Sequence, residues 1–303
     1  MNVSAIEKLV HNIRNHRQSL EKSAIPFRTQ SKLTSFDKSN CDDWCNSVYG
    51  DSLIKLRLFT ENNFTVIETL SLVSVSRYIL ELSIWLNLFM QDSRYGLVYY
   101  GQLIKGNLQY WERFKNQIER EITFLKKTEE EESELFEKEM KALLSITDEK
   151  EKIAAASSVS TNVQNIIDSN AARYFSIHAE QAKHNGYGFQ ANLVERKQLT
   201  LITKNISETQ QAQREFDSSI SPQVKNLIPK RWNWCDMAKS VNMEGEYDFI
   251  YSFTSKLLHA TPMSITTNQK NLESQEIILF LKYIDIKIKD IIKLSDSYLN
   301  KNT

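Results

Sequence analysis

The stretch LSLVSVSRYILELSIWLNLFM, residues 70–90, decides the fold. It is long and apolar enough to suggest a membrane span, but Arg77 and Glu81 lie in its middle. Four residues apart, they share one helix face and can pair with each other. Neither flank carries the excess of Lys and Arg that orients a membrane helix. The stretch therefore predicts the buried central helix of a bundle, and no membrane partner is expected.

Composition favours the same fold class. The 303 residues include only 7 Gly and 4 Pro, too few for the many turns of a sandwich, barrel or doubly wound sheet. With 41% hydrophobic residues, the chain can bury a substantial core. The sequence thus predicts an all-α protein, a bundle of long antiparallel helices.

Charge and the N-terminal segment bear on partners and location. Lys plus Arg and Asp plus Glu both total 38, so no overall charge attracts the chain to nucleic acid or anionic lipid. The first 17 residues, MNVSAIEKLVHNIRNHR, lack the apolar core of a secretory signal. A cytoplasmic protein is expected, and any nucleic-acid binding would have to be local.

Hydrophobic spacing outlines the domains. An N-terminal helix over residues 3–22 and a loosely packed polar arm or loop over 23–46 are expected within a first segment, residues 1–60. Residues 61–303 are expected to form a single helical domain that includes a projecting helical hairpin at about 107–218. Within that hairpin, helical spacing continues through residues 155–188 and ends at Asn185-Gly186, a turn or helix C-cap signal.

The most patterned stretch is RWNWCDMAKSVNMEGEYDFIYSFTSKLLHATPMSI, residues 231–265. Within it, aromatic and polar residues recur every fourth position: Tyr247, Tyr251, Ser255 and His259. On a helix they would form one row, which Pro262 would end. If this row faces Arg77 and Glu81, these side chains form a polar pocket. The alternatives are a structural ion pair for Arg77 and Glu81, and a packed core position for His259.

The same stretch resembles the C-terminal signature of an uncharacterised bacterial all-helical family, domain of unknown function 5677. The resemblance is carried by Trp232, Trp234, Ala238, the row of four residues above and Pro262, and by Arg77-x-x-x-Glu81 followed by QDSRY. It spans about residues 60–295. It implies a helical intracellular protein, sometimes encoded near phage-defence genes, in which Arg77, Glu81, Tyr251, Ser255 and His259 meet in space. It implies no particular activity.

A second local resemblance involves RYFSIH, residues 173–178. Arg173, four intervening residues and His178 on a predicted helix resemble the Arg-x4-6-His motif of the HEPN superfamily, helical proteins that often dimerise and cut RNA. The resemblance implies that Arg173 and His178 are catalytic at a homodimer interface. An Arg can hold a phosphate, and a His can act as a general acid or base near neutral pH. The alternative is two surface residues of a helix.

Other catalytic signatures are missing from the sequence. It contains no Walker motif, Gly-rich dinucleotide fingerprint, nucleophile elbow or His-Glu-x-x-His helix. Cys41 and Cys45 lack a second close pair or His-x-x-x-His that would complete a zinc site, and Cys235 stands apart. No cofactor and no metal are expected.

Two functional hypotheses follow. The first is a HEPN-like, metal-independent RNase effector in bacterial stress or phage defence, a homodimer that acts on RNA through Arg173 and His178, or through His259 with Arg77. The second is a non-enzymatic helical sensor or scaffold. In that case the long amphipathic helices at 107–151 and 190–218 would bind a protein partner.

Overall fold

A computed structural model describes residues 2–33, 35–62, 68–259 and 272–302. Throughout these ranges the secondary structure is helical, without strands, which confirms the predicted all-α fold. The chain divides into two compact units, Met1–Gln102 with Ser218–Thr303, and Leu103–Asp217. We call them unit 1 and unit 2.

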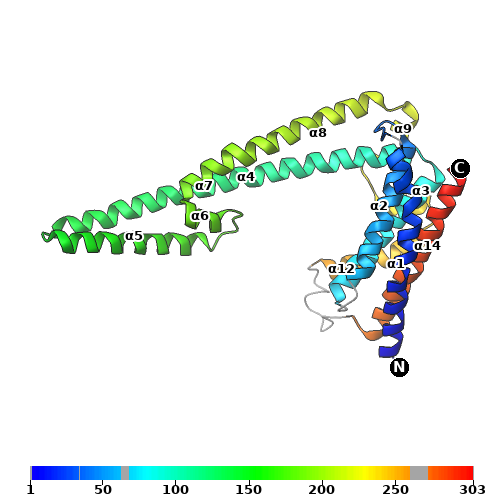
Figure 1. Cartoon of the computed structure of the whole chain (residues 1–303), viewed down its shortest axis with the longest axis horizontal. Helices are drawn as coiled ribbons and strands as arrows, with labels where there is room; N and C mark the ends of the chain where they lie inside the picture. The colour runs from blue at the N-terminus through cyan, green and yellow to red at the C-terminus, as the bar shows by residue number, and fades with distance from the viewer. Residues whose placement is uncertain (1, 34, 63–67, 260–271, 303) are drawn as a thin grey trace. The chain divides into compact units, whose positions relative to one another are not determined.

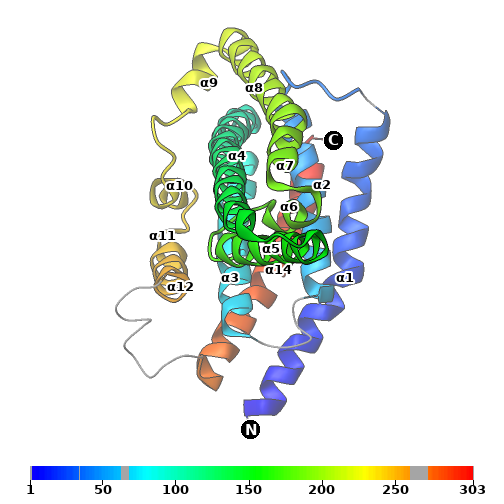
Figure 2. The same ribbon diagram turned by 90° about the vertical axis from the view of Figure 1, so that its left-hand side faces the viewer.

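Unit 1 is a helical bundle. Its long helices are α1 (Asn2–Leu33), α2 (Cys41–Asn62), α3 (Thr69–Gln91), the start of α4 (Tyr95–Ala142) and α14 (Ser274–Asn302). Helix α1 packs on α2 and α14, and α14 packs in turn on α3 (Figure 2). Shorter helices follow in the chain: α9 (Pro222–Leu227), α10 (Trp234–Ser240), α11 (Glu244–Glu246), a π-helical turn η3 (Tyr247–Tyr251) and α12 (Ser252–Leu258). Of these, α10, η3 and α12 pack on α3 (Figure 2).

Helix α3 contributes most to the core of unit 1. Among the described helices, it is the one that could cross a membrane by length and composition, but 67% of its most apolar window is buried against the rest of the protein. Leu80, Ile84 and Leu86 are fully buried there, together with Phe280 and Ile284 of α14. Packing within unit 1 therefore accounts for the apolar character of α3.

Helix α1 corrects the predicted arm over residues 23–46. The helix continues through Pro26 to Leu33, and α2 already begins at Cys41. An interior proline costs one backbone hydrogen bond and commonly ends or kinks a helix. Here Ala24 and Phe27 on either side of it are buried, and Phe27 stacks on Tyr49 with ring centroids 5.5 Å apart. Burial of this face offsets the local cost of Pro26.

A charged contact joins α1 to α14. His16 Nε2 lies 2.7 Å from Asp285 Oδ1, and Lys289 Nζ donates to Asp285 Oδ2 at 2.6 Å. Burial alone raises the pKa of Asp285, but the hydrogen bonds from Lys289 and His16 outweigh it, and the pKa lies below its ordinary value of 3.8. The folded state therefore binds this proton more weakly than the unfolded state.

This lowered pKa predicts acid sensitivity. Asp285 contributes stability that is fully present above its unfolded pKa and is lost as the pH falls through its lower folded pKa. We expect Asp285→Asn to lose less stability than wild type between pH 6 and pH 3, measured by urea unfolding. Asp236→Asn, at an exposed position, is the control and should follow wild type. Identical pH profiles for Asp285→Asn and wild type would contradict this account.

Unit 2 contains most of α4, followed by η1 (Leu143–Ser145), α5 (Glu149–Ala171), α6 (Ala179–Asn185), α7 (Tyr187–Leu193), a π-helical segment η2 (Val194–Leu199) and most of α8 (Thr200–Ser219). Helix α5 runs back beside the C-terminal part of α4. Helix α8 runs along the part of α4 that comes earlier in the chain (Figure 1). Leu125 packs with Val163 and Ile167 of α5, and Ile118 packs with Val194 and Ile202.

Helical spacing over residues 155–188 does not give a continuous helix. Helix α5 ends at Ala171 and α6 begins at Ala179, so residues 172–178 form a connecting loop, which we call the 172–178 loop. At the end of α6, Gly186 adopts φ 85°, and its N–H donates to the Ala182 carbonyl at 2.8 Å. This is the C-cap that the Asn-Gly pair predicted.

Candidate functional site

The structure brings four of the predicted pocket residues together in unit 1. Arg77 Nε donates to Glu81 Oε1 at 3.1 Å, and Arg77 Nη1 donates to Ser255 Oγ at 3.2 Å. The Arg77 guanidinium also lies 4.3 Å from the centroid of the Tyr251 ring, a cation–π contact. Arg77 therefore ties α3 to the segment η3–α12 through two interactions, the hydrogen bond to Ser255 and the cation–π contact with Tyr251.

The π-helical turn η3 shapes this row. Tyr247 and Tyr251 lie at its two ends, and their rings stack with centroids 4.6 Å apart. Ser255 follows one turn later on α12, which ends at Leu258. His259 leaves the helix with an extended backbone (φ −106°, ψ 145°) and is exposed, so the predicted row stops at Ser255. Pro262, predicted to end the helix, lies outside the described residues.

A pocket of about 510 Å³ lies next to this cluster, with Glu81 in its lining. Helices α2, α3, α4 and α10 all contribute to it. Its aromatic lining residues are Tyr78, Trp85, Tyr99 and Trp234, and its charged ones are Asp51, Lys55 and Glu81. The pocket thus combines large π surfaces with a small number of charges, as ligand sites do.

Most of these lining residues were not predicted as a site. Tyr78, Glu81 and Trp85 are spaced at i, i+3 and i+7 on α3, so they share one face. Asp51 and Lys55, at i and i+4 on α2, share a face as well. These spacings were available in the sequence, but the pairing of the two faces depends on how α2 and α3 pack.

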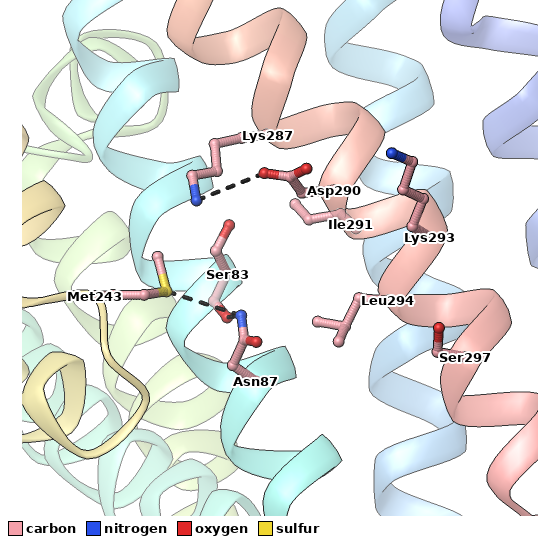
Figure 3. A pocket seen from close by; sticks show the side chains of 9 residues that line it. All are labelled: Ser83, Asn87, Met243, Lys287, Asp290, Ile291, Lys293, Leu294 and Ser297. Atoms are coloured by element: carbon pink, nitrogen blue, oxygen red, sulfur yellow. Dashed lines mark hydrogen bonds and ion pairs between the residues drawn. The ribbon is translucent and has the colours of Figure 1, made fainter.

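A second pocket of unit 1, about 380 Å³, lies between α3 and α14 (Figure 3). Two of its charged lining residues, Lys287 and Asp290, lie within ion-pair distance of each other, and Lys293 lines it as well. Lys287 Nζ donates to Glu246 Oε1 at 2.7 Å and lies 3.8 Å from Asp290 Oδ2. Asn87 donates to the Ser83 carbonyl at 2.8 Å. Because these polar groups already bond within the protein, this pocket is the weaker ligand site.

The 172–178 loop of unit 2 is held by a buried acid. Glu121 of α4, only 2% exposed, accepts hydrogen bonds from the Ser176 hydroxyl and, at 2.9 Å, from the His178 N–H. Ser176 Oγ also accepts from the Ala179 N–H at 2.9 Å, which satisfies a donor at the start of α6. A single side chain of α4 therefore orders the loop and the helix that follows.

Arg173 and His178 are not on the helix that the sequence predicted for them. They lie in the loop rather than on one helix. His178 is 8% exposed, and its Nε2 lies 3.2 Å from Gln198 Oε1 of η2. Arg173 is exposed, and within the described ranges no acid forms an ion pair with it. His178 is thus packed within unit 2, and Arg173 lies on the surface.

Of the three cysteines, Cys45 is buried, whereas Cys41 and Cys235 are partly exposed. Burial raises the pKa of Cys45 to about 12, so its thiol stays protonated at neutral pH. Over the residues with described positions, no three or more His, Cys, Asp or Glu side chains group as metal ligands would.

Comparison of the chain with protein-family models, curated proteins and solved structures gives no match. The class that the fold and sites define is an all-α protein with an aromatic pocket in unit 1 and an ordered surface loop in unit 2.

Proposed function

We propose that this chain is a non-enzymatic helical sensor or scaffold whose 172–178 loop binds a partner protein. The observation that carries the proposal is the exposure of two neighbouring aromatic side chains in this loop: Phe175 is 86% exposed and Tyr174 is 66% exposed. Aromatic residues so exposed in an otherwise ordered segment are a common feature of protein interaction sites.

The order of the loop supports this role. The Arg173 and Tyr174 N–H groups donate to the carbonyls of Asn170 and Ala171, each at 3.1 Å. The Tyr174 ring contacts Phe124 of α4, with centroids 5.7 Å apart, and Glu121 holds the far end of the loop. Because the backbone is already ordered, docking a partner would cost little additional conformational entropy.

The residue types in the loop also fit an interface. Arg173, Tyr174 and Phe175 are consecutive and exposed, and Arg and Tyr are enriched among residues that dominate binding energy. Within the described residues Arg173 has no acidic partner, and it lies beside two exposed rings, which favours a partner surface with an apolar pocket and an acidic rim. The residues that suggested a nuclease motif in the sequence thus gain a different explanation.

The test is substitution at the exposed ring. We expect Phe175→Ser to abolish, or weaken at least about tenfold, a stoichiometric complex purified with the chain from its native cells, because truncating an aromatic hot spot of an interface removes about 2 kcal/mol or more. Leu144→Ser is the matched control, since Leu144 is 74% exposed elsewhere in unit 2. It should leave the complex intact.

Two outcomes would contradict the proposal. One is equal recovery of the complex with Phe175→Ser and wild type, with both folded by circular dichroism. The other is degradation of cellular RNA by wild type that His178→Gln prevents, which would restore the ribonuclease hypothesis. Recovery of a second copy of the chain would identify the partner as the chain itself.

A further inference from the structure

The pocket beside Glu81 has features that the proposed partner binding does not use. It lies wholly within unit 1, whereas the 172–178 loop belongs to unit 2. We propose that this pocket binds the ammonium group of a small organic cation, which would be the signal that a sensor of this kind detects.

The walls of the pocket suit a cation. The Trp85 ring packs edge-to-face with Tyr99 (centroids 5.2 Å apart) and with Trp234 (6.4 Å), and it stacks on Trp232 behind it (4.2 Å). Tyr78 completes the aromatic lining. Ring faces carry partial negative charge and attract ammonium groups, most strongly when water is excluded. Several rings around one cavity are the usual arrangement for recognising alkylated ammonium ions.

The protein already places cations on rings in this region. Lys55 Nζ lies 5.9 Å from the centroid of the Tyr78 ring, which lines the pocket. Lys55 is exposed, so its ammonium can move into solvent when another cation enters. Its position shows that this wall of the pocket accepts a positive charge.

The carboxylates supply the attraction that a cation needs. Asp51 lines the pocket, and in the described parts of the chain no side chain forms a hydrogen bond or ion pair with it. Glu81 shares one oxygen, Oε1, with Arg77. Because Arg77 compensates Glu81, the movement of Lys55 into solvent would leave the negative charge of Asp51 uncompensated in the pocket.

The tyrosine hydroxyls do not alter this charge. Burial raises the pKa of Tyr99, with a further contribution from the nearby Asp51 carboxylate. Burial likewise raises the pKa of Tyr78, together with the neighbouring Tyr99. Both hydroxyls stay neutral at physiological pH and can donate or accept hydrogen bonds to a polar substituent of the ligand.

The experiment compares choline with 3,3-dimethyl-1-butanol, which has nearly the same shape and no charge. Binding to the full chain is followed by calorimetry and by tryptophan fluorescence, to which the pocket residues Trp85 and Trp234 contribute. We expect choline to bind at least about tenfold more tightly than the neutral alcohol, and acetate not to bind. Phe175→Ser should bind choline as wild type does, which separates this inference from partner binding.

Two substitutions that should change choline affinity in opposite directions test whether the pocket attracts positive charge. Asp51→Asn should weaken choline binding about fivefold, and Lys55→Gln should strengthen it by a few fold, because one removes an attraction and the other a repulsion. Tyr78→Leu should weaken binding, while Tyr78→Phe, which keeps the ring, should not. Thermal unfolding checks that each variant is folded.

Three results would overturn the proposal. They are no choline binding at tens of millimolar, equal affinity for choline and the neutral alcohol, or anion binding that Lys55→Gln abolishes. The last result would make Lys55 the ligand-binding charge and reverse the assignment.

Discussion

Replacing Phe27 by alanine is expected to destabilise unit 1 by about 3–5 kcal/mol, the usual effect of truncating a buried phenylalanine. Phe27 is 2% exposed, and its ring stacks on Tyr49 (centroids 5.5 Å apart) and Tyr298 (6.5 Å). These rings come from α1, α2 and α14, so the substitution leaves a cavity where three helices meet. Urea unfolding followed by circular dichroism measures the loss.

Ile25→Ala is the control for this prediction, because Ile25 lies on the same helix and is 57% exposed. It should cost less than about 1 kcal/mol, as surface substitutions do. If residues 23–33 were a loose arm, both substitutions would have small effects. Similar small losses for Phe27→Ala and Ile25→Ala would therefore contradict the long α1.

Replacing Gly96 by alanine is expected to destabilise unit 1 by about 1–3 kcal/mol or more, because it overpacks a tight contact. A Cβ at Gly96 would lie 2.2 Å from the Cys41 carbonyl oxygen and 3.0 Å from Cys45 Sγ. The first of these atoms is backbone, so it cannot rotate away, and the first turns of α2 and α4 would have to separate. Thermal and urea unfolding measure the effect.

Gly106→Ala makes a matched comparison on the same helix. A Cβ at Gly106 would meet no atom within 4 Å, so this substitution should stabilise the helix by up to about 1 kcal/mol, as alanine replacing an interior glycine does. The two variants should therefore shift stability in opposite directions. Stabilisation by both would show that α2 and α4 do not approach closely at Gly96.

The sequence was most informative where local spacing and burial agree. In α3, an apolar stretch interrupted by Arg77 and Glu81 predicted a buried helix with an intrahelical ion pair, and both are present. The four-residue spacing of Tyr251 and Ser255 placed them on the face that meets Arg77. His259 follows the same spacing, but the helix ends one residue before it. Periodicity does not reveal where a helix stops.

Other features depended on distant residues and could not be predicted locally. The polar sequence after Ser23 suggested a loop. However, α1 continues through Pro26, because the burial of Phe27 stabilises the helix there. Residues 172–178 kept helical spacing, yet Glu121, more than fifty positions earlier in the chain, holds them in a loop. In both cases tertiary contacts outweigh local preference.

The aromatic pocket shows the same limit at the level of a site. Tyr78 and Trp85 share a face of α3, but Tyr99 and Trp234 come from α4 and α10. The sequence alone does not show how these helices pack, so it does not indicate that the four rings line one cavity. The signal available in the sequence was only the spacing on each separate helix.

The central claim, that the 172–178 loop binds a partner protein, is tested most directly by site-specific photo-cross-linking in native cells. A benzophenone amino acid at position 175 should capture one discrete protein in high yield. The same probe at position 144, which is also exposed in unit 2, should not capture it. Equal, diffuse or absent cross-linking from both positions, with folded protein at normal abundance, would contradict the claim.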